Sequence, residues 1–182
     1  MTHPSLKLGF IGLGIMGTPM AGHLRAAGHE LFVTTRSAVP QALLDAGAVA
    51  CKTPAEVAKN AEVIFTMVPD TPDVQKVLFG DNGIASALTK GKTVVDMSSI
   101  SPIETKEFAK KINALGCDYL DAPVSGGEVG AKNATLSIMV GASPGLFARI
   151  EPLLRYMGSD VTHCGEVGCG QVVKLVNNTL NF

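Results

Sequence analysis

Gly12-Leu13-Gly14-Ile15-Met16-Gly17 follows an apolar run, Leu6–Ile11, and opens a helical pattern over Met16–Ala27. A glycine-rich turn between a strand and a helix is typical of a dinucleotide-binding βαβ unit. In such a turn Gly12 permits the tight reversal, Gly14 lets the backbone approach a pyrophosphate, and Gly17 lets helix and strand pack closely. The first N–H groups of the helix would face the phosphates. These six residues are therefore the predicted phosphate loop.

Along the rest of the chain, apolar runs of strand length alternate with helical patterns. The predicted strands are Leu6–Ile11, Glu30–Thr34, Val63–Val68, Thr93–Met97, Asp118–Ala122, Leu136–Val140 and Val161–Cys164, with a short one near Val49. The predicted helices are Met16–Ala27, Val39–Ala46, Pro54–Lys59, Thr71–Leu78, Pro102–Leu115, Pro144–Tyr156 and a final one over Gly168–Phe182. This alternation predicts one α/β domain with a doubly wound, mostly parallel sheet that helices cover on both faces.

Local residues mark several helix ends. Thr53-Pro54 and Ser101-Pro102 each combine a capping hydroxyl with proline at the first helical position. Gly28 and Gly116 follow two helices at points where a positive φ is often needed. Together these positions predict boundaries for three of the helices.

The composition is that of a globular protein with a large core: 46% of residues are hydrophobic, 17% are charged, and the net charge is −1. This balance gives no electrostatic footprint for nucleic acid or for an anionic membrane. There is no 18-residue apolar run and no signal-peptide pattern, so we expect a cytoplasmic protein. His163, Cys164 and Cys169 lie close in sequence, but their spacing is not that of a zinc site, and no metal is expected.

The end of the second strand bears on the choice of cofactor. NAD-binding folds usually place Asp or Glu here to bind the ribose 2′-hydroxyl, and no acid occurs in Val33-Thr34-Thr35-Arg36-Ser37. Arg36, with Thr35 beside it, could instead bind a 2′-phosphate through charge-assisted hydrogen bonds. NADP is therefore favoured, and NAD remains an alternative in which Arg36 is simply solvated.

Two further turns follow apolar strands. Met67-Val68-Pro69 and Ser98-Ser99 fall at carboxyl ends of strands, where open α/β sheets bind ligands. They are predicted to line the crevice on its ribose and nicotinamide side. Each turn taken alone could equally be structural.

Candidate catalytic groups lie later in the chain. Ser125-Gly126-Gly127 offers a hydroxyl and unobstructed backbone N–H groups, which suit a carboxylate, although such a stretch is more often a flexible turn. Lys174 stands among Val172, Val173, Leu175 and Val176 in the final helix. A buried lysine shifts its pKa readily and suits proton transfer. The alternative is that Lys174 is an ordinary surface lysine without a catalytic role. Asn177 and Asn178 would share its helix face.

The final helix is apolar around most of its circumference. We therefore expect it to be buried on several sides, or to support self-association into a homo-oligomer.

These motifs together resemble the β-hydroxyacid dehydrogenase family, which includes 3-hydroxyisobutyrate and 6-phosphogluconate dehydrogenases. The resemblance is carried by Gly9 to Gly17 with Met20-Ala21, by Asp121-Ala122-Pro123-Val124-Ser125-Gly126-Gly127, and by Gly165 to Gly170 leading to Lys174 and Asn178. It spans essentially the whole chain. The turns at Met67–Pro72 and Asp96–Pro102 look most like those of members that reduce tartronate semialdehyde (2-hydroxy-3-oxopropionate).

The resemblance implies a Rossmann-type domain over residues 1–165 and the start of an inter-domain helix over 166–182. It implies NAD(P)H-dependent reduction of a small aldehyde acid, with Lys174 as general acid. It implies that Ser125, Gly126 and Gly127 bind the substrate carboxylate, that Asn178 (favoured over Asn177) places the substrate, and that Ser99 lies near the nicotinamide.

Family members continue into an all-helical domain, which is absent from this chain. A catalytically incomplete cofactor-binding fragment is therefore one alternative to an active tartronate semialdehyde reductase, and an enzyme of the 3-hydroxyisobutyrate dehydrogenase type is another. A third possibility is an interaction module, which the presence of Lys174, Ser125 and Asn178 argues against.

Overall fold

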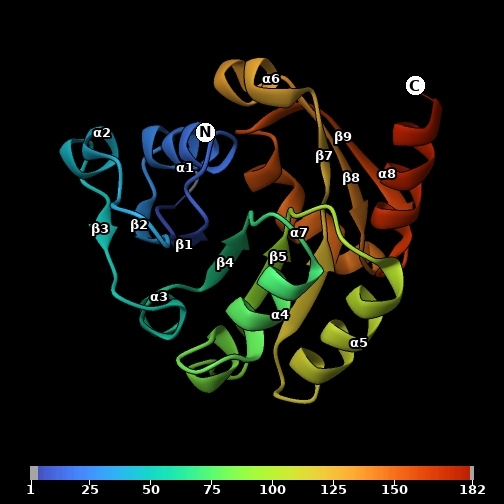
Figure 1. The fold of residues 1–182 in the computed structure, drawn as a ribbon, viewed down its shortest axis with the longest axis horizontal. Coiled ribbons are helices and arrows are strands. Elements are labelled where there is room, and N and C mark those ends of the chain that lie inside the picture. The colour runs from blue at the N-terminus through green and yellow to red at the C-terminus, as the bar shows by residue number, and fades with distance from the viewer. Residues whose placement is uncertain (1–3, 181–182) are drawn as a thin grey trace.

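The computed structural model of the protein describes residues 4–180. In this part of the chain one sheet is flanked by helices on both faces (Figure 1). The strands are β1 (Lys7–Ile11), β2 (Glu30–Thr34), β3 (Val49–Ala50), β4 (Val63–Thr66), β5 (Thr93–Asp96), β6 (Asp118–Asp121), β7 (Val124–Ser125), β8 (Leu136–Gly141) and β9 (Gly158–Gly165). The helices are α1 (Gly17–Ala26), α2 (Gln41–Asp45), α3 (Pro54–Asn60), α4 (Thr71–Phe79), α5 (Pro102–Asn113), α6 (Gly127–Asn133), α7 (Pro144–Leu154) and α8 (Cys169–Leu180), with a 3₁₀ turn η1 (Ile84–Ser86).

The strand order explains where a ligand can bind. The sheet runs β3-β2-β1-β4-β5-β6-β8-β7, with β9 paired to β8. The strands from β3 to β6 are parallel, whereas β8 is antiparallel to β6 and β7. The chain reverses its direction of winding between β1 and β4, and ligands bind outside the carboxyl ends of strands at such a point. The predicted Rossmann-type, doubly wound sheet is confirmed.

Two apolar cores hold the layers together. One lies between the sheet and α1, α2, α6 and α7, and includes Phe10, Leu24 and Leu154. The other lies between the sheet and α3, α4 and α5, and includes Ile64 and Ile112. The central strands are buried on both faces, which is why their sequences are continuous apolar runs without alternation. No helix among residues 4–180 is long and apolar enough to cross a membrane.

The predicted helix boundaries hold at all four positions. Thr53 Oγ1 accepts a hydrogen bond from Glu56 N at 3.2 Å, and Ser101 Oγ accepts one from Ile103 N at 3.3 Å. Gly28 and Gly116 have φ values of +95° and +73°. Capping therefore fixes the starts of α3 and α5 and helps end α1 and α5.

One segment was not predicted: β7 and α6, where the sequence indicated only a loop. Strand β7 has two residues, and α6 has the sequence GEVGAKN, whose two glycines weaken its helical propensity. Packing overrides this weakness. Gly130 and Ala131 are the buried residues of α6, and His23 Nε2 of α1 is 2.9 Å from Ala131 O. Strand β9 also begins three residues earlier than predicted.

Of the two expectations for the final helix, burial on several sides is not met within residues 4–180, and self-association stays a prediction. Gly170 and Gln171 are buried, but Val172, Val173, Leu175 and Val176 are 39–54% exposed. The reason is that α8 contacts the sheet through a single face, at the edge of the molecule (Figure 1). Phe182, the last residue of the predicted helix, lies outside the described residues.

Candidate cofactor and active site

The phosphate loop is held between the carboxyl ends of β2 and β4. Gly12 has a φ of +97°, and its N–H donates to Thr34 O at 3.0 Å. A Cβ on Gly12 would overlap the carbonyl oxygen of Met67, and one on Gly17 would overlap the carbonyl oxygen of Gly12. Both glycines are therefore required by the fold itself, whatever binds the loop.

Gly14 differs from its two neighbours in the motif. It is exposed, its φ is not positive, and a Cβ built on it has no heavy atom within 4 Å. Three residues later, at Gly17, α1 begins without a side-chain cap and without an acidic residue in its first turn. Free backbone N–H groups and an unneutralised helix dipole fit an anionic pyrophosphate. Of the other loop residues, Leu13 is buried and the side chain of Ile15 is 69% exposed.

Thr35 and Arg36, at which the sequence predicts the ribose of the cofactor to bind, directly follow β2. Thr35 Oγ1 accepts a hydrogen bond from Leu13 N at 3.4 Å, which joins the phosphate loop to the end of β2. The Arg36 side chain is 79% exposed and lies 3.2 Å from Asp73 Oδ1 in the first turn of α4. Such an exposed pair is worth little, so the guanidinium remains available to a phosphate.

The turns after β4 and β5 meet at the same edge of the sheet, as predicted. Val68 N donates to Ser98 Oγ at 3.0 Å, so the two turns are joined directly. Met67 is half-buried, whereas Pro69 and Ser99 are exposed. These residues follow β4 and β5, which lie on the other side of β1 from β2 in the sheet.

Asn177 connects α8 to Ser125, the last residue of β7. Its Nδ2 donates to Ser125 Oγ at 3.3 Å. Gly126 and Gly127, which follow, are exposed and have positive φ values. Asn178 is exposed and makes no such contact with Ser125, although the sequence favoured it over Asn177.

Lys174 lies one turn before Asn177 on the same face of α8. Its side chain is half-buried, and burial lowers the pKa of its amine from the ordinary value. Desolvation disfavours the ammonium form, so this lysine gives up a proton more readily than a surface lysine does.

The sequence analysis missed a buried polar network at the carboxyl ends of β5 and β6. Asp96 is fully buried and accepts hydrogen bonds from Thr66 Oγ1 (2.8 Å), Ser98 N (3.1 Å) and Tyr119 OH (3.0 Å). Asp121 is also fully buried and accepts from Gly168 N (2.6 Å) and Gln171 N (2.9 Å). Gln171 could have been noticed as a polar residue in an apolar helix, one turn before Lys174. Apart from Ser98 N, the partners of Asp96 and Asp121 come from distant segments and leave no local pattern.

Asp121 makes the stability of the fold depend on pH. Burial, with the nearby charge of Asp96, raises the pKa of Asp121 from 3.8 to about 6, against the opposing effect of the two N–H donors. The folded state therefore holds this proton more tightly than the unfolded chain. The resulting stabilisation is complete below pH 3.8 and is lost as the pH rises through about 6. It amounts to roughly 3 kcal/mol.

We expect Asp121→Asn to reveal this dependence, because asparagine has no proton to lose. The unfolding free energy of the wild type minus that of the variant should fall by roughly 2 kcal/mol between pH 4 and pH 7, because pH 4 already lies above the unfolded pKa of 3.8. Urea denaturation at a series of pH values measures it. Asp118→Asn, at a half-exposed position on the same strand, is the control. A difference that stays constant or grows with pH would contradict the assignment.

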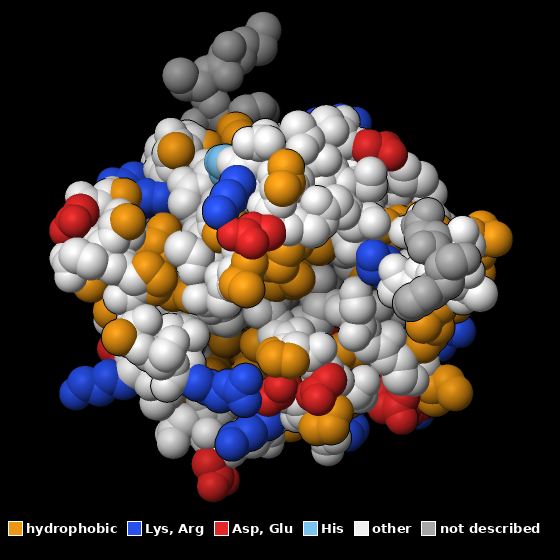
Figure 2. All heavy atoms as spheres, turned by 45° about the horizontal axis from the view of Figure 1, so that its top comes forward, with side chains coloured by type: hydrophobic (Ala, Val, Ile, Leu, Met, Phe, Trp, Pro, Cys, Tyr) orange, Lys and Arg blue, Asp and Glu red, His pale blue; other side chains and the backbone are white. Residues whose placement is uncertain are grey.

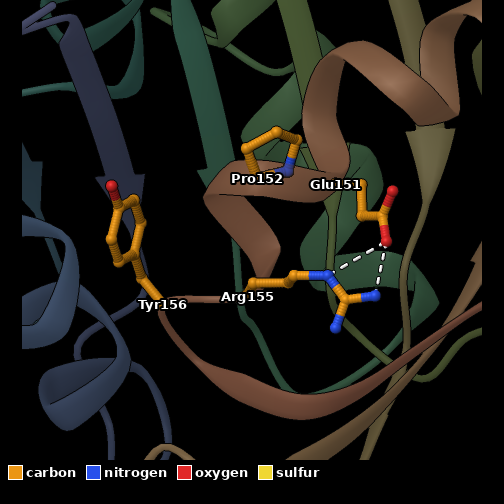
Figure 3. Close-up of a pocket in the computed structure, with 4 residues that line it drawn as sticks. All are labelled: Glu151, Pro152, Arg155 and Tyr156. Atoms are coloured by element: carbon orange, nitrogen blue, oxygen red, sulfur yellow. Dashed lines mark hydrogen bonds and ion pairs between the residues drawn. The ribbon is translucent and has the colours of Figure 1, made fainter. Parts of the chain in front are cut away.

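The pocket drawn in Figure 3 belongs to another part of the molecule. It is lined by Glu151, Pro152, Arg155 and Tyr156 near the end of α7. Tyr156 also lines a neighbouring pocket with Leu6 and His29. These two residues directly precede β1 and β2, so this pocket lies at the amino-terminal ends of the strands. Arg155 donates twice to Glu151 Oε1, at 3.0 and 2.6 Å, so its charge is already paired.

The doubly wound sheet and the glycine loop define a dinucleotide-binding domain. Residues 7–165 match the NAD binding domain of 6-phosphogluconate dehydrogenase, and the chain belongs to this family of NAD(P)-binding domains.

Three similar proteins place the chain more closely. It is 57% identical to the 2-hydroxy-3-oxopropionate reductase of Escherichia coli, over 96% of this chain and 60% of the reductase. The 3-hydroxyisobutyrate dehydrogenase of Mycobacterium tuberculosis, solved with L-serine, superposes with a TM-score of 0.91 at 32% identity, over 98% of this chain and 60% of the other. Psf3, solved with NADP+ and 2-OPP, gives a TM-score of 0.88 at 33% identity, over 95% and 62% of the two chains. The chain thus spans about three-fifths of the length of these relatives.

Proposed function

We propose that the chain is the cofactor-binding part of an NAD(P)H-dependent reductase that converts tartronate semialdehyde into D-glycerate. The contact between Asn177 Nδ2 and Ser125 Oγ, at 3.3 Å, carries this proposal. It brings the helix that bears Lys174 to a loop whose hydroxyl and backbone N–H groups suit a carboxylate. The identity to the E. coli reductase supports this substrate among small aldehyde acids.

In the proposed reaction each group has one task. Gly12–Gly17 would hold the pyrophosphate of NAD(P)H, and the cofactor when bound would supply a hydride to the aldehyde carbon. Ser125, Gly126 and Gly127 hold the substrate carboxylate, and Asn178, with Asn177 beside it, places the carbonyl group. The Lys174 ammonium gives its proton to the aldehyde oxygen, which becomes the product hydroxyl. The neutral amine that remains takes a proton from water, and the roles reverse in the oxidation.

The preferred cofactor is NADPH. The end of β2 carries Arg36 and no acid, and the exposed guanidinium can turn from Asp73 to a 2′-phosphate. Figure 2 shows acidic and basic side chains interspersed over the face that comes forward from the top of Figure 1. With no broad positive field there, a single arginine would decide the preference.

We expect Arg36→Ala to weaken NADPH binding by roughly 10- to 100-fold, the loss for a charge-assisted hydrogen bond, and to leave NADH binding unchanged. Fluorescence titration of each cofactor measures the two dissociation constants. Arg155→Ala removes another ion-paired arginine, at the end of α7 (Figure 3), and should change neither. Equal effects of Arg36→Ala on NADPH and NADH would overturn the NADP assignment.

The activity itself is tested by NADPH consumption with a panel of aldehyde acids: tartronate, methylmalonate and succinic semialdehydes. The highest kcat/KM is expected for tartronate semialdehyde. A preference for methylmalonate semialdehyde would instead indicate a 3-hydroxyisobutyrate dehydrogenase. Binding of NADPH without turnover of any of them would indicate a catalytically incomplete fragment. The cytoplasmic location and self-association through the exposed face of α8 stay predictions.

A further inference from the structure

Gln171 is a buried amide that the proposed reaction does not use. Its side chain is 1% exposed and lies in the first turn of α8. The Oε1 atom accepts a hydrogen bond from Ile100 N at 3.1 Å, and Nε2 donates to Ser98 O at 2.7 Å. A buried amide with both ends paired fixes two segments with a defined geometry, because each lost partner would leave a buried polar group unsatisfied.

These two bonds grip the backbone on either side of Ser99. Ser98 and Ile100 are buried, whereas Ser99 between them is exposed. The Ser98 hydroxyl accepts from Val68 N at 3.0 Å, and Ser98 N donates to Asp96 at 3.1 Å. Gln171 therefore holds the turn after β5 directly, and it holds the turn after β4 indirectly, through the hydrogen bond between Ser98 and Val68.

Gln171 also fixes the helix to which it belongs. Its own N–H donates to Asp121 Oδ2 at 2.9 Å, at the end of β6. Lys174 and Asn177 follow at intervals of three residues, so they lie above Gln171 on one face of α8. Gln171 is thus the residue that joins the cofactor side of the crevice, at Val68 and Ser99, to the helix that carries Lys174.

We propose that Gln171 is a positioning residue, which clamps helix α8 to the Ser98–Ile100 turn and so sets the place of Lys174 relative to the cofactor. The consequence for turnover rests on the proposed reductase function, but the clamp itself does not. Proton transfer depends on distance, and a displacement of about 1 Å can lower a rate by about 100-fold.

Gln171→Met tests the clamp, because methionine keeps the length and apolar stem of the side chain and loses both hydrogen bonds. The matched control is Thr105→Val. Thr105 is fully buried, and its Oγ1 donates at 2.9 Å to the carbonyl oxygen of Ser101, the N-cap of α5, and not to Ser98, Ile100 or α8. Both variants lose buried hydrogen bonds, and both should lower the melting temperature.

Of these two variants, only Gln171→Met should shift the pKa of Lys174. In NMR titrations of the lysine side chains, with the Lys174 signal assigned by Lys174→Arg, the pKa of Lys174 should rise toward its ordinary value because the loosened helix exposes the amine to water. In turnover, kcat should fall by roughly 10- to 100-fold, with KM and the NADPH dissociation constant nearly unchanged. Gln171→Asn, whose shorter amide cannot reach both partners, should act in the same direction if the methionine variant does not fold.

The clamp is overturned if Gln171→Met and Thr105→Val leave the Lys174 titration equally unchanged. A failure of the reductase function gives a different result. In that case no variant consumes NADPH with any aldehyde acid, and the Lys174 titration still separates Gln171→Met from Thr105→Val.

Discussion

Lys174→Ala is expected to lower kcat by about 100- to 10,000-fold, the contribution typical of a general acid, and to leave the NADPH dissociation constant within about twofold. The physical reason is the position of the amine. Lys174 is half-buried on the face of α8 that contacts Ser125 through Asn177. The phosphate loop lies elsewhere, between β1 and α1, so the loss of the amine leaves it intact. Stopped-flow and steady-state measurements of NADPH oxidation, with fluorescence titration of NADPH, separate the two quantities.

Two further variants make the role of Lys174 specific. Lys174→Arg keeps the positive charge, but its guanidinium does not give up a proton near neutral pH, so it should also lose most of kcat. Lys110→Ala removes an exposed lysine of α5 and should change nothing. The general-acid role is contradicted if Lys174→Ala keeps its kcat, or if it loses cofactor affinity as strongly as kcat.

Gly14→Ala should weaken NADPH binding by roughly 10- to 100-fold without lowering the melting temperature. A methyl group here meets no protein atom within 4 Å, and the backbone φ is not positive, so the fold accepts alanine. The same methyl group would stand where the pyrophosphate approaches the backbone, and an overpacked contact costs about 1–3 kcal/mol. Fluorescence titration and thermal unfolding give both numbers.

Two other glycines complete this test. Gly145→Ala, at an equally open position in the first turn of α7, is the matched control and should affect neither binding nor melting. Gly17→Ala should instead destabilise the fold, because its Cβ would overlap the carbonyl oxygen of Gly12. If Gly14→Ala binds NADPH normally, the pyrophosphate does not lie against this part of the loop.

The sequence was enough to predict the parts of the fold that depend on local patterns. The parallel strands are apolar runs because helices bury both faces, and Thr53 and Ser101 mark helix starts through their own hydroxyl groups. Helix α6 could not be predicted in this way. Its glycines disfavour a helix, and it forms because Gly130 and Ala131 are small enough to be buried beside α1.

In the candidate site too, the sequence predicted the residues that form local patterns and missed those that act through distant contacts. Gly12, Gly14 and Gly17 form a contiguous motif, and each has the geometry that its proposed role requires. Lys174 stood out as a charge in an apolar helix. Gln171 and Asp121 act through contacts with residues 47 to 73 positions away in the chain, and only the three-dimensional arrangement brings those partners together.

The most direct test of the proposed function is the transfer of deuterium from NADPH labelled at C4 of the nicotinamide to tartronate semialdehyde. The wild-type protein is predicted to form glycerate with deuterium at C3, the former aldehyde carbon, detected by NMR, and Lys174→Ala is predicted to form almost none. If the wild-type protein binds NADPH but transfers no label to this or any other aldehyde acid, the reductase function is wrong and the glycine loop serves cofactor binding alone.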